Sequence, residues 1–145
     1  MRHPGLSAQR CASVAALALG AALAVPVLAA EPGTPLTAEE FDALSVGRTM
    51  FYESGGQAYG AEQYLPGRRV IWAFLGDDCL KGTWYADGKD ICFVYEDRPD
   101  PQCWTFYKSA NGLIARFRDT PDGAPLVGVE QSPAPLACLG PDVGV

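Results

Sequence analysis

Four cysteines constrain this chain more than any other feature, because they follow an N-terminal segment typical of exported proteins. In an oxidising compartment, an even number of cysteines in a small domain predicts a framework of disulfide bonds. The sequence therefore predicts a small, disulfide-stapled domain. The four are Cys79, Cys92, Cys103 and Cys138.

The N-terminal segment has the parts of a secretory signal peptide. Two arginines precede an uncharged, alanine-rich run over residues 12–28, and the small residues Ala29 and Ala30 follow it. A retained transmembrane anchor is the alternative, but a glycine and a proline break the run. We predict a signal peptide over residues 1–30, cleaved after Ala29 or Ala30. The product would be periplasmic, without a membrane contact.

Cleavage would change the composition of the chain. It would remove Cys11, which leaves an even number of cysteines, and His3, the only histidine. It would also remove Arg2 and Arg10, so the remainder is more acidic than the full chain, whose formal net charge is −6. An acidic surface repels nucleic acid and anionic membranes, so we expect neither as a partner.

The residue types that remain exclude several chemistries. Without histidine there is no Ser-His-Asp or Cys-His catalysis and no histidine-containing zinc site. The cysteines form no C-x-x-C pair, which argues against thiol exchange and a zinc ribbon. There is no G-x-S-x-G, P-loop or G-x-G-x-x-G motif, and the Gly55-Gly56 pair suits a hairpin turn better than a phosphate site. We predict no catalytic residue, no metal and no cofactor.

The chain after residue 30 is predicted to form one domain. We expect a leader over residues 31–35, a single β-rich domain over residues 36–131, and a Pro-rich tail over residues 132–145 that Cys138 tethers.

A short helix should open the domain. Thr37 and Glu40 have the spacing of a capping box, in which each side chain binds the backbone of the other residue. Phe41 and Leu44 give this helix an apolar stripe, and Gly47 is a natural end.

Beyond this helix the pattern is one of strands and turns. Eight short runs rich in β-branched and aromatic residues are separated by turn residues, among them Arg98-Pro-Asp-Pro101. Closure into a barrel would leave no exposed strand edge. We predict a mainly β fold, an antiparallel meander or small barrel of about eight strands with one short N-terminal helix and disulfide staples. The runs are residues 48–53, 58–65, 68–75, 79–86, 90–96, 102–108, 113–119 and 125–131.

Alternation along the central strands separates two faces. One face carries Trp84, Phe93 and Trp104, which we predict to pack together as structural core. The other face carries three of the cysteines.

The cysteine positions favour one pairing. Cys92 and Cys103 flank one hairpin at similar distances from its turn, so a bond between them would close a short loop and stabilise the fold by about 3 kcal/mol. Cys138 lies in the tail, which a bond to Cys79 would fasten across the sheet. Four cysteines allow three connectivities, of which we predict Cys92–Cys103 with Cys79–Cys138.

Carboxylates are the remaining candidates for chemistry. Clustered carboxylates can bind calcium, and paired ones can hydrolyse glycosides. Aspartate is also common in turns, so we predict solvated turns, with a weak cation site as the alternative. Glu53 and Glu62 lie in predicted strands, and we expect both to face outward. The clusters are Asp77-Asp78, Asp87 with Asp90, and Glu96-Asp97 with Asp100.

Tyrosine and tryptophan are dense for so small a domain. Such rings at a barrel mouth could hold a small apolar or sugar ligand. The alternative, which we expect, is packing in the core and across strands. The residues are Tyr52, Tyr59, Tyr64, Trp72, Trp84, Tyr85, Tyr95, Trp104 and Tyr107.

A series of short motifs runs through the chain: Leu36-Thr-Ala-Glu-Glu40, Gly47-Arg-Thr49, Tyr64…Gly67-Arg68, Gly82-Thr-Trp84, Asp87-Gly88, Ile91-Cys-Phe93 and Cys103-Trp104. In this order they resemble a family of small exported proteobacterial domains, in which a short helix precedes a G-K-T segment and strands with G-x-W and C-F motifs. The likeness covers about residues 36–118, with Arg48 in place of the lysine and the tail with Cys138 as an extension. The resemblance implies export and a β-rich domain, and it supplies no catalytic residue.

These features favour a non-catalytic periplasmic module that binds a protein or a small ligand of unknown identity. One alternative is an inhibitor of a basic envelope hydrolase such as lysozyme, which an acidic surface would suit. The other is a carboxylate-dependent hydrolase of cell-wall glycosides, which needs two carboxylates about 5–9 Å apart in a cleft.

Overall fold

The structure, a computed structural model, describes residues 33–74, 78–110 and 112–138. The predicted signal peptide, with Cys11 and His3, lies outside these residues, as does the end of the tail. No helix in the described ranges has the length and apolar character needed to cross a membrane.

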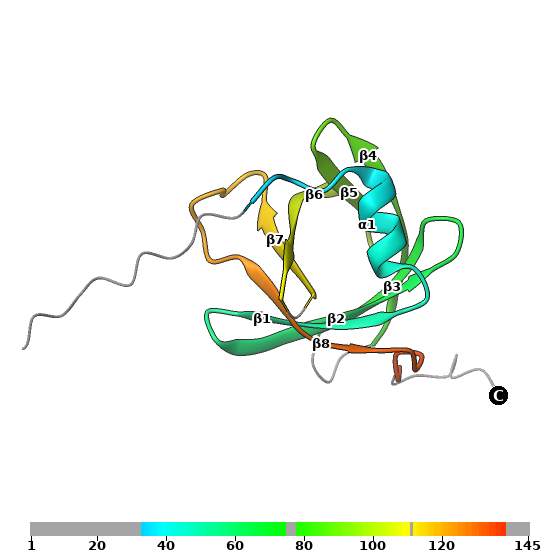
Figure 1. The fold of residues 1–145 in the computed structure, drawn as a ribbon. Helices are drawn as coiled ribbons and strands as arrows, with labels where there is room; N and C mark the ends of the chain where they lie inside the picture. Colours follow the sequence, from blue (N-terminus) through cyan, green and yellow to red (C-terminus); the bar gives the residue numbers. More distant parts are fainter. Residues whose placement is uncertain (1–32, 75–77, 111, 139–145) are drawn as a thin grey trace, which may run out of the picture. The chain divides into compact units, whose positions relative to one another are not determined.

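Eight antiparallel strands close into a barrel in chain order (Figure 1). Each strand pairs with the next along the chain, and β8 returns to pair with β1. The mainly β fold is confirmed, and closure decides for a barrel over an open meander. The strands are β1 (Thr49–Ser54), β2 (Gln57–Leu65), β3 (Arg69–Phe74), β4 (Leu80–Asp87), β5 (Asp90–Tyr95), β6 (Arg98–Ser109), β7 (Gly112–Phe117) and β8 (Leu126–Ser132).

The ladders differ in length around the barrel. The β1–β2 and β2–β3 ladders each hold six register pairs. The β7–β8 ladder holds two, Ile114 with Val127 and Ala115 with Leu126. The barrel wall therefore has its fewest backbone pairs at the β7–β8 seam.

Gly55 and Gly56 form the turn between β1 and β2, as their dipeptide predicts. Ser54 and Gln57 pair across the turn, so the loop contains only the two glycines. Both glycines have positive φ, 58° and 77°, which a two-residue hairpin loop of this type requires and side chains disfavour.

β6 begins earlier than the sequence predicts. Arg98 already pairs with Tyr95 of β5, so the expected turn at residues 98–101 is wrong. The register shifts between Phe93 and Tyr95, and residues 99–101 are exposed at this irregularity. Prolines are tolerated at such bulges because the ladder needs no N–H from them there.

Helix α1 (Ala38–Ser45) closes one end of the barrel. The predicted capping box is present: Thr37 accepts a hydrogen bond from the backbone of Glu40, whose side chain accepts one from the backbone of Thr37. Phe41 is fully buried and contacts four rings from four strands. In Figure 1, α1 lies across the ring of strands. The four rings are Tyr64, Trp84, Phe93 and Phe106.

Both predicted disulfides are present, Cys92–Cys103 and Cys79–Cys138. Cys92 and Cys103 are directly opposite each other in the β5–β6 register. The second bond holds the tail, which also accepts a hydrogen bond at Ala134 from Thr49. The tail therefore lies along the barrel wall near β1.

The three rings predicted as core have different environments. Trp84 and Phe93 are opposite each other in register and are 3% and 2% exposed. Trp104 is half-buried at the edge of the core, with its ring centroid 4.8 Å from that of Phe117. Trp104 also lines a cavity in the barrel interior.

Candidate functional site

The barrel interior contains a cavity at the end away from α1. The volume in it that a water-sized molecule can reach is about 40 Å³. Buried side chains form its floor, and half-buried or exposed ones form its rim. The floor consists of Tyr52, Glu62, Tyr64, Phe93 and Phe106; the rim includes Tyr59, Phe74, Leu80, Arg98, Gln102 and Trp104.

Glu62 of β2 points into this cavity, so the expectation that it faces outward is wrong. Its side chain is on the same face of β2 as Gly60 and Tyr64, and the residue is 4% exposed. Trp72 of β3 is its partner in register and also lines the cavity. The pleat of β2 therefore places the carboxylate among aromatic side chains. Glu53, by contrast, is half-buried and does not line the cavity.

Two tyrosines hold the carboxylate of Glu62. The Tyr95 hydroxyl donates to Oε1 at 2.7 Å, and the Tyr64 hydroxyl donates to Oε2 at 3.2 Å. The hydroxyl oxygens of Tyr52 and Tyr64 are 2.9 Å apart. While Glu62 is ionised, Tyr64 gives its proton to the carboxylate, so the Tyr52 hydroxyl, which also lies 3.5 Å from the Met50 sulfur, is the donor to Tyr64. The result is a chain of hydrogen bonds in which Glu62 only accepts.

Burial shifts the acid–base chemistry of this group. It raises the pKa of Glu62 from 4.5 to about 7, although the hydrogen bonds from Tyr95 and Tyr64 lower it. Burial also raises the pKa of Tyr52, Tyr64 and Tyr95 above their ordinary value. The three hydroxyls therefore keep their protons at neutral pH, where Glu62 titrates.

The aromatic wall of the cavity depends on a glycine. A Cβ at Gly60 would be 2.6 Å from the Trp72 ring and 2.6 Å from the carbonyl oxygen of Ala73. Trp72 in turn contacts Phe74 and Tyr59, with ring centroids 5.3 Å and 5.9 Å away. Glycine at position 60 lets the indole lie flat against β2, so three rings form one side of the cavity.

Arg98 lies at the rim and is paired outside the cavity. Its guanidinium donates to both carboxylate oxygens of Asp97, at 3.2 Å and 3.1 Å. The hydrogen bond from Arg98 holds the pKa of Asp97 below its ordinary value. Among the described side chains, none forms an ion pair with Glu62.

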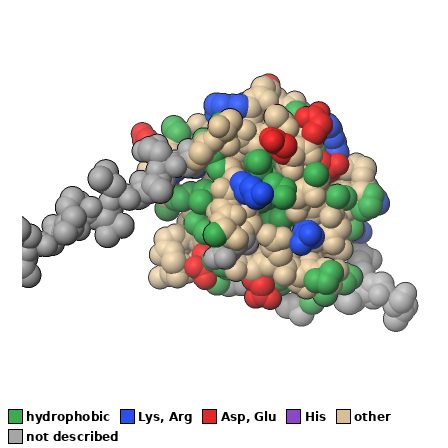
Figure 2. Space-filling model, in the orientation of Figure 1, with side chains coloured by type: hydrophobic (Ala, Val, Ile, Leu, Met, Phe, Trp, Pro, Cys, Tyr) green, Lys and Arg blue, Asp and Glu red, His purple; other side chains and the backbone are tan. Residues whose placement is uncertain are grey.

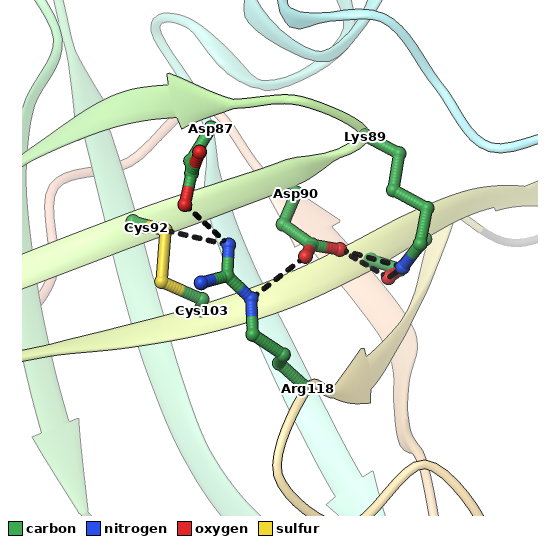
Figure 3. The surroundings of a disulfide bond; sticks show 7 residues. Asp87, Lys89, Asp90, Cys92, Cys103 and Arg118 are labelled. Carbon is green, nitrogen blue, oxygen red and sulfur yellow. Dashed lines mark hydrogen bonds and ion pairs between the residues drawn. A yellow bond between two sulfur atoms is a disulfide. The ribbon is translucent and has the colours of Figure 1, made fainter.

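A second polar cluster lies on the outer face beside the Cys92–Cys103 bond (Figure 3). Asp90 is 5% exposed, so it is not the solvated turn residue that the sequence predicts. Arg118 joins Asp90 at 2.8 Å and Asp87 at 2.7 Å, and Lys89 contacts Asp90 at 3.0 Å.

The partners of Asp90 come from three parts of the chain: Lys89 precedes it in the β4–β5 turn, Thr105 is its register partner on β6, and Arg118 follows β7. Burial alone would raise the pKa of Asp90, but hydrogen bonds from Thr105, Lys89 and Arg118 lower it below its ordinary value. The charge of Asp90 is thus balanced by cations of the chain itself. No group of three potential metal ligands occurs among the described residues.

The other acidic residues of the predicted clusters, as far as the structure describes them, do not form a group of potential metal ligands. Asp78 and Asp100 are exposed, Glu96 accepts a hydrogen bond from the backbone of Lys81, and Asp77 lies outside the described residues. On the face shown in Figure 2, acidic, basic and hydrophobic side chains are interspersed. That face offers no acidic patch.

The chain matches no protein-family model, no curated protein and no solved structure. The cavity is therefore interpreted from its own chemistry.

The predicted aromatic residues divide between the two roles that the sequence left open. Trp84 packs in the core, and Tyr85 and Tyr107 lie outside the cavity lining. The other six line the cavity, and some of them also belong to the core. Strand alternation could have placed Glu62 among these cavity-lining residues, because Tyr64 is two residues further along β2 and therefore lies on the same face.

Proposed function

We propose that this protein is a non-catalytic binding module whose cavity takes a small ligand. One observation supports this more than any other: a buried carboxylate, Glu62, lies in an aromatic cavity that is open to solvent. A closed barrel needs no such group for its stability, because burying a carboxylate costs free energy. Apolar walls with a few polar groups are typical of ligand sites.

The hydrolase alternative has less support. Glycoside hydrolysis uses two carboxylates about 5–9 Å apart. The described lining contains a single carboxylate, that of Glu62. An inhibitor of a basic hydrolase also has less support, because Asp87, Asp90 and Asp97 are paired with basic side chains of the same chain.

Export to the periplasm remains part of the proposal. The two disulfides support an oxidising compartment, and the N-terminal sequence supports a signal peptide. Membership in the family of exported domains rests on the order of the sequence motifs.

The three tryptophans allow a direct test. Trp72 and Trp104 line the cavity, whereas Trp84 packs at the α1 end. We would titrate the oxidised, ¹⁵N-labelled protein with benzylammonium, benzyl alcohol, benzoate and methyl glucoside, and follow the indole N–H signals by NMR. At least one probe should shift Trp72 and Trp104 saturably while Trp84 stays in place.

Two phenylalanine variants, one at the rim and one outside the lining, provide a matched comparison. Gln102→Phe should narrow the mouth and weaken binding about tenfold, a change of about 1.4 kcal/mol. Thr83→Phe, at an exposed position outside the lining, should bind as the wild type does. If no probe shifts Trp72 and Trp104, or if all three indoles shift together, the cavity is not a ligand site.

A further inference from the structure

The cavity has a charge that its own lining does not balance. Glu62 supplies the carboxylate of the described lining, and the groups around it are neutral hydroxyls and aromatic rings. Arg98, the basic residue of the described lining, is held at the rim by Asp97. An ionised Glu62 would therefore attract a positive charge into the cavity.

The carboxylate has unused capacity to accept hydrogen bonds. Each of its oxygens accepts one hydrogen bond from a described side chain, Oε1 from Tyr95 and Oε2 from Tyr64. A carboxylate offers about four lone-pair positions, so one on each oxygen is available to a donor from a ligand. An ammonium group carries such donors together with the complementary charge.

The rings suit a cation as well. Tyr59, Trp72 and Phe74 form one side of the cavity, with centroids 5.3–5.9 Å apart. The face of an aromatic ring attracts a cation, and tryptophan does so most strongly. The same faces can pack against the hydrocarbon part of an organic ligand.

Other ligand classes fit this lining less well. An anion would be repelled by Glu62. A sugar needs many polar partners, but the hydroxyls of Tyr52, Tyr64 and Tyr95 are already engaged, which leaves Gln102 as the main free polar group. A neutral apolar molecule would cover the carboxylate without balancing its charge.

We propose that the cavity binds a small organic cation, with its ammonium group on Glu62 and its apolar part against Trp72 and Tyr59. This inference rests on the proposed function and names the ligand class of the same site.

The test compares two probes of nearly equal shape, benzylammonium and benzyl alcohol. Dissociation constants would be measured at pH 8 from the indole signals of Trp72 and Trp104, for the wild type and for Glu62→Gln. Benzylammonium should bind the wild type more tightly than benzyl alcohol does. Glu62→Gln should weaken benzylammonium at least about tenfold and change benzyl alcohol less than about threefold, because charged hydrogen bonds are the stronger ones.

The pH dependence of the wild type is a second measurement that needs no variant. Of the groups facing Glu62, Tyr52, Tyr64 and Tyr95 keep their protons between pH 6 and pH 8, and Arg98 at the rim stays charged. Only Glu62 loses its charge in this range, since its pKa is about 7. Affinity for benzylammonium should fall about tenfold from pH 8 to pH 6, while that for benzyl alcohol should not.

Each other outcome contradicts a specific claim. If benzyl alcohol binds as tightly as benzylammonium, the cation assignment is wrong. It is also wrong if neither Glu62→Gln nor pH changes the affinity for benzylammonium. In both cases the proposal that the cavity binds a ligand is retained. If neither probe shifts Trp72 and Trp104, the cation assignment is wrong. The proposed function then depends on the benzoate and glucoside titrations. Should Glu62→Gln fail to fold, the pH series alone decides.

Discussion

At the scale of single residues, Glu62 links the stability of the barrel to pH. The pKa of the Glu62 carboxyl is about 7 in the folded protein, whereas its ordinary value is 4.5. The folded state therefore binds this proton more tightly than the unfolded state does. The stability that this provides is complete below pH 4.5 and is lost as the pH rises through 7, a loss on the order of 3 kcal/mol.

Glu62→Gln should remove this dependence, since glutamine has no charge to bury. From pH 4.5 to pH 8, the free energy of unfolding of the variant should gain about 3 kcal/mol relative to that of the wild type. Urea denaturation at several pH values measures the difference. Glu53→Gln, on β1 and outside the cavity lining, is the control and should follow the wild type. Parallel profiles for Glu62→Gln and wild type would contradict the burial of the charge.

The position of Glu62 shows where sequence reasoning stops at this scale. A charged residue in a strand faces water by default, because burial of a charge costs free energy. Alternation puts Glu62 on the same face as Tyr64, but the way in which its charge is accommodated becomes clear only from the pairing of β2 with β3, which places Trp72 opposite Glu62, and from the hydroxyls that hold its oxygens. Tyr95, one of those donors, is 33 residues away in the sequence.

At the scale of elements, the fully buried side chain of α1 that packs into the barrel is Phe41, with Ala38 and Leu44 packed against the core beside it. Phe41 fills the space between rings from β2, β4, β5 and β6 and is fully buried. Phe41→Ala should lower the free energy of unfolding by about 3–5 kcal/mol, because it leaves a cavity in a packed site. Val46→Ala, at the exposed end of the helix, should cost less than about 0.5 kcal/mol.

Urea denaturation measures both helix variants, and the indole signal of Trp84 locates the effect. Its ring centroid is 5.1 Å from that of Phe41, so this signal should shift in Phe41→Ala. Equal stability of the two variants would mean that α1 is only loosely attached to the barrel.

Elements with local signals could be predicted from the sequence. The capping box at Thr37 and Glu40 and the turn at Gly55 and Gly56 depend on residues next to each other in the chain. The start of β6 could not, because Pro99 and Pro101 suggest a turn and the bulge that accommodates them depends on the partner strand.

At the scale of the whole molecule, the disulfide pairing was predictable because geometry leaves few choices. Cys92 and Cys103 are directly opposite in register, which the hairpin already implies. The bond from Cys79 to Cys138 spans 59 residues and follows once the first pair is made. The open cavity could not be predicted, since it depends on how eight strands close and on which end α1 covers.

Processing of the N-terminus is a prediction at this scale. Protein isolated from the cell envelope should begin at Ala30 or Glu31, because small residues precede Glu31 and follow the apolar run. Intact-mass measurement gives the first residue directly. The reduced and oxidised masses should differ by four hydrogens, for two disulfides and no free thiol. A mass that includes residues 1–29 would contradict both cleavage and the periplasmic assignment.

The two-pair ladder between β7 and β8 affects how the barrel opens. All other neighbouring strands are joined by longer ladders, of four to six register pairs, so the β7–β8 seam loses the fewest backbone pairs when it separates. Ala115 and Leu126, which pair at this seam, also line the cavity. Thermal breathing of the seam would widen the cavity while the Phe41 cluster at the other end keeps the rest of the barrel folded. A ligand site of the kind proposed here would then accept ligands of more than one size without unfolding of the barrel.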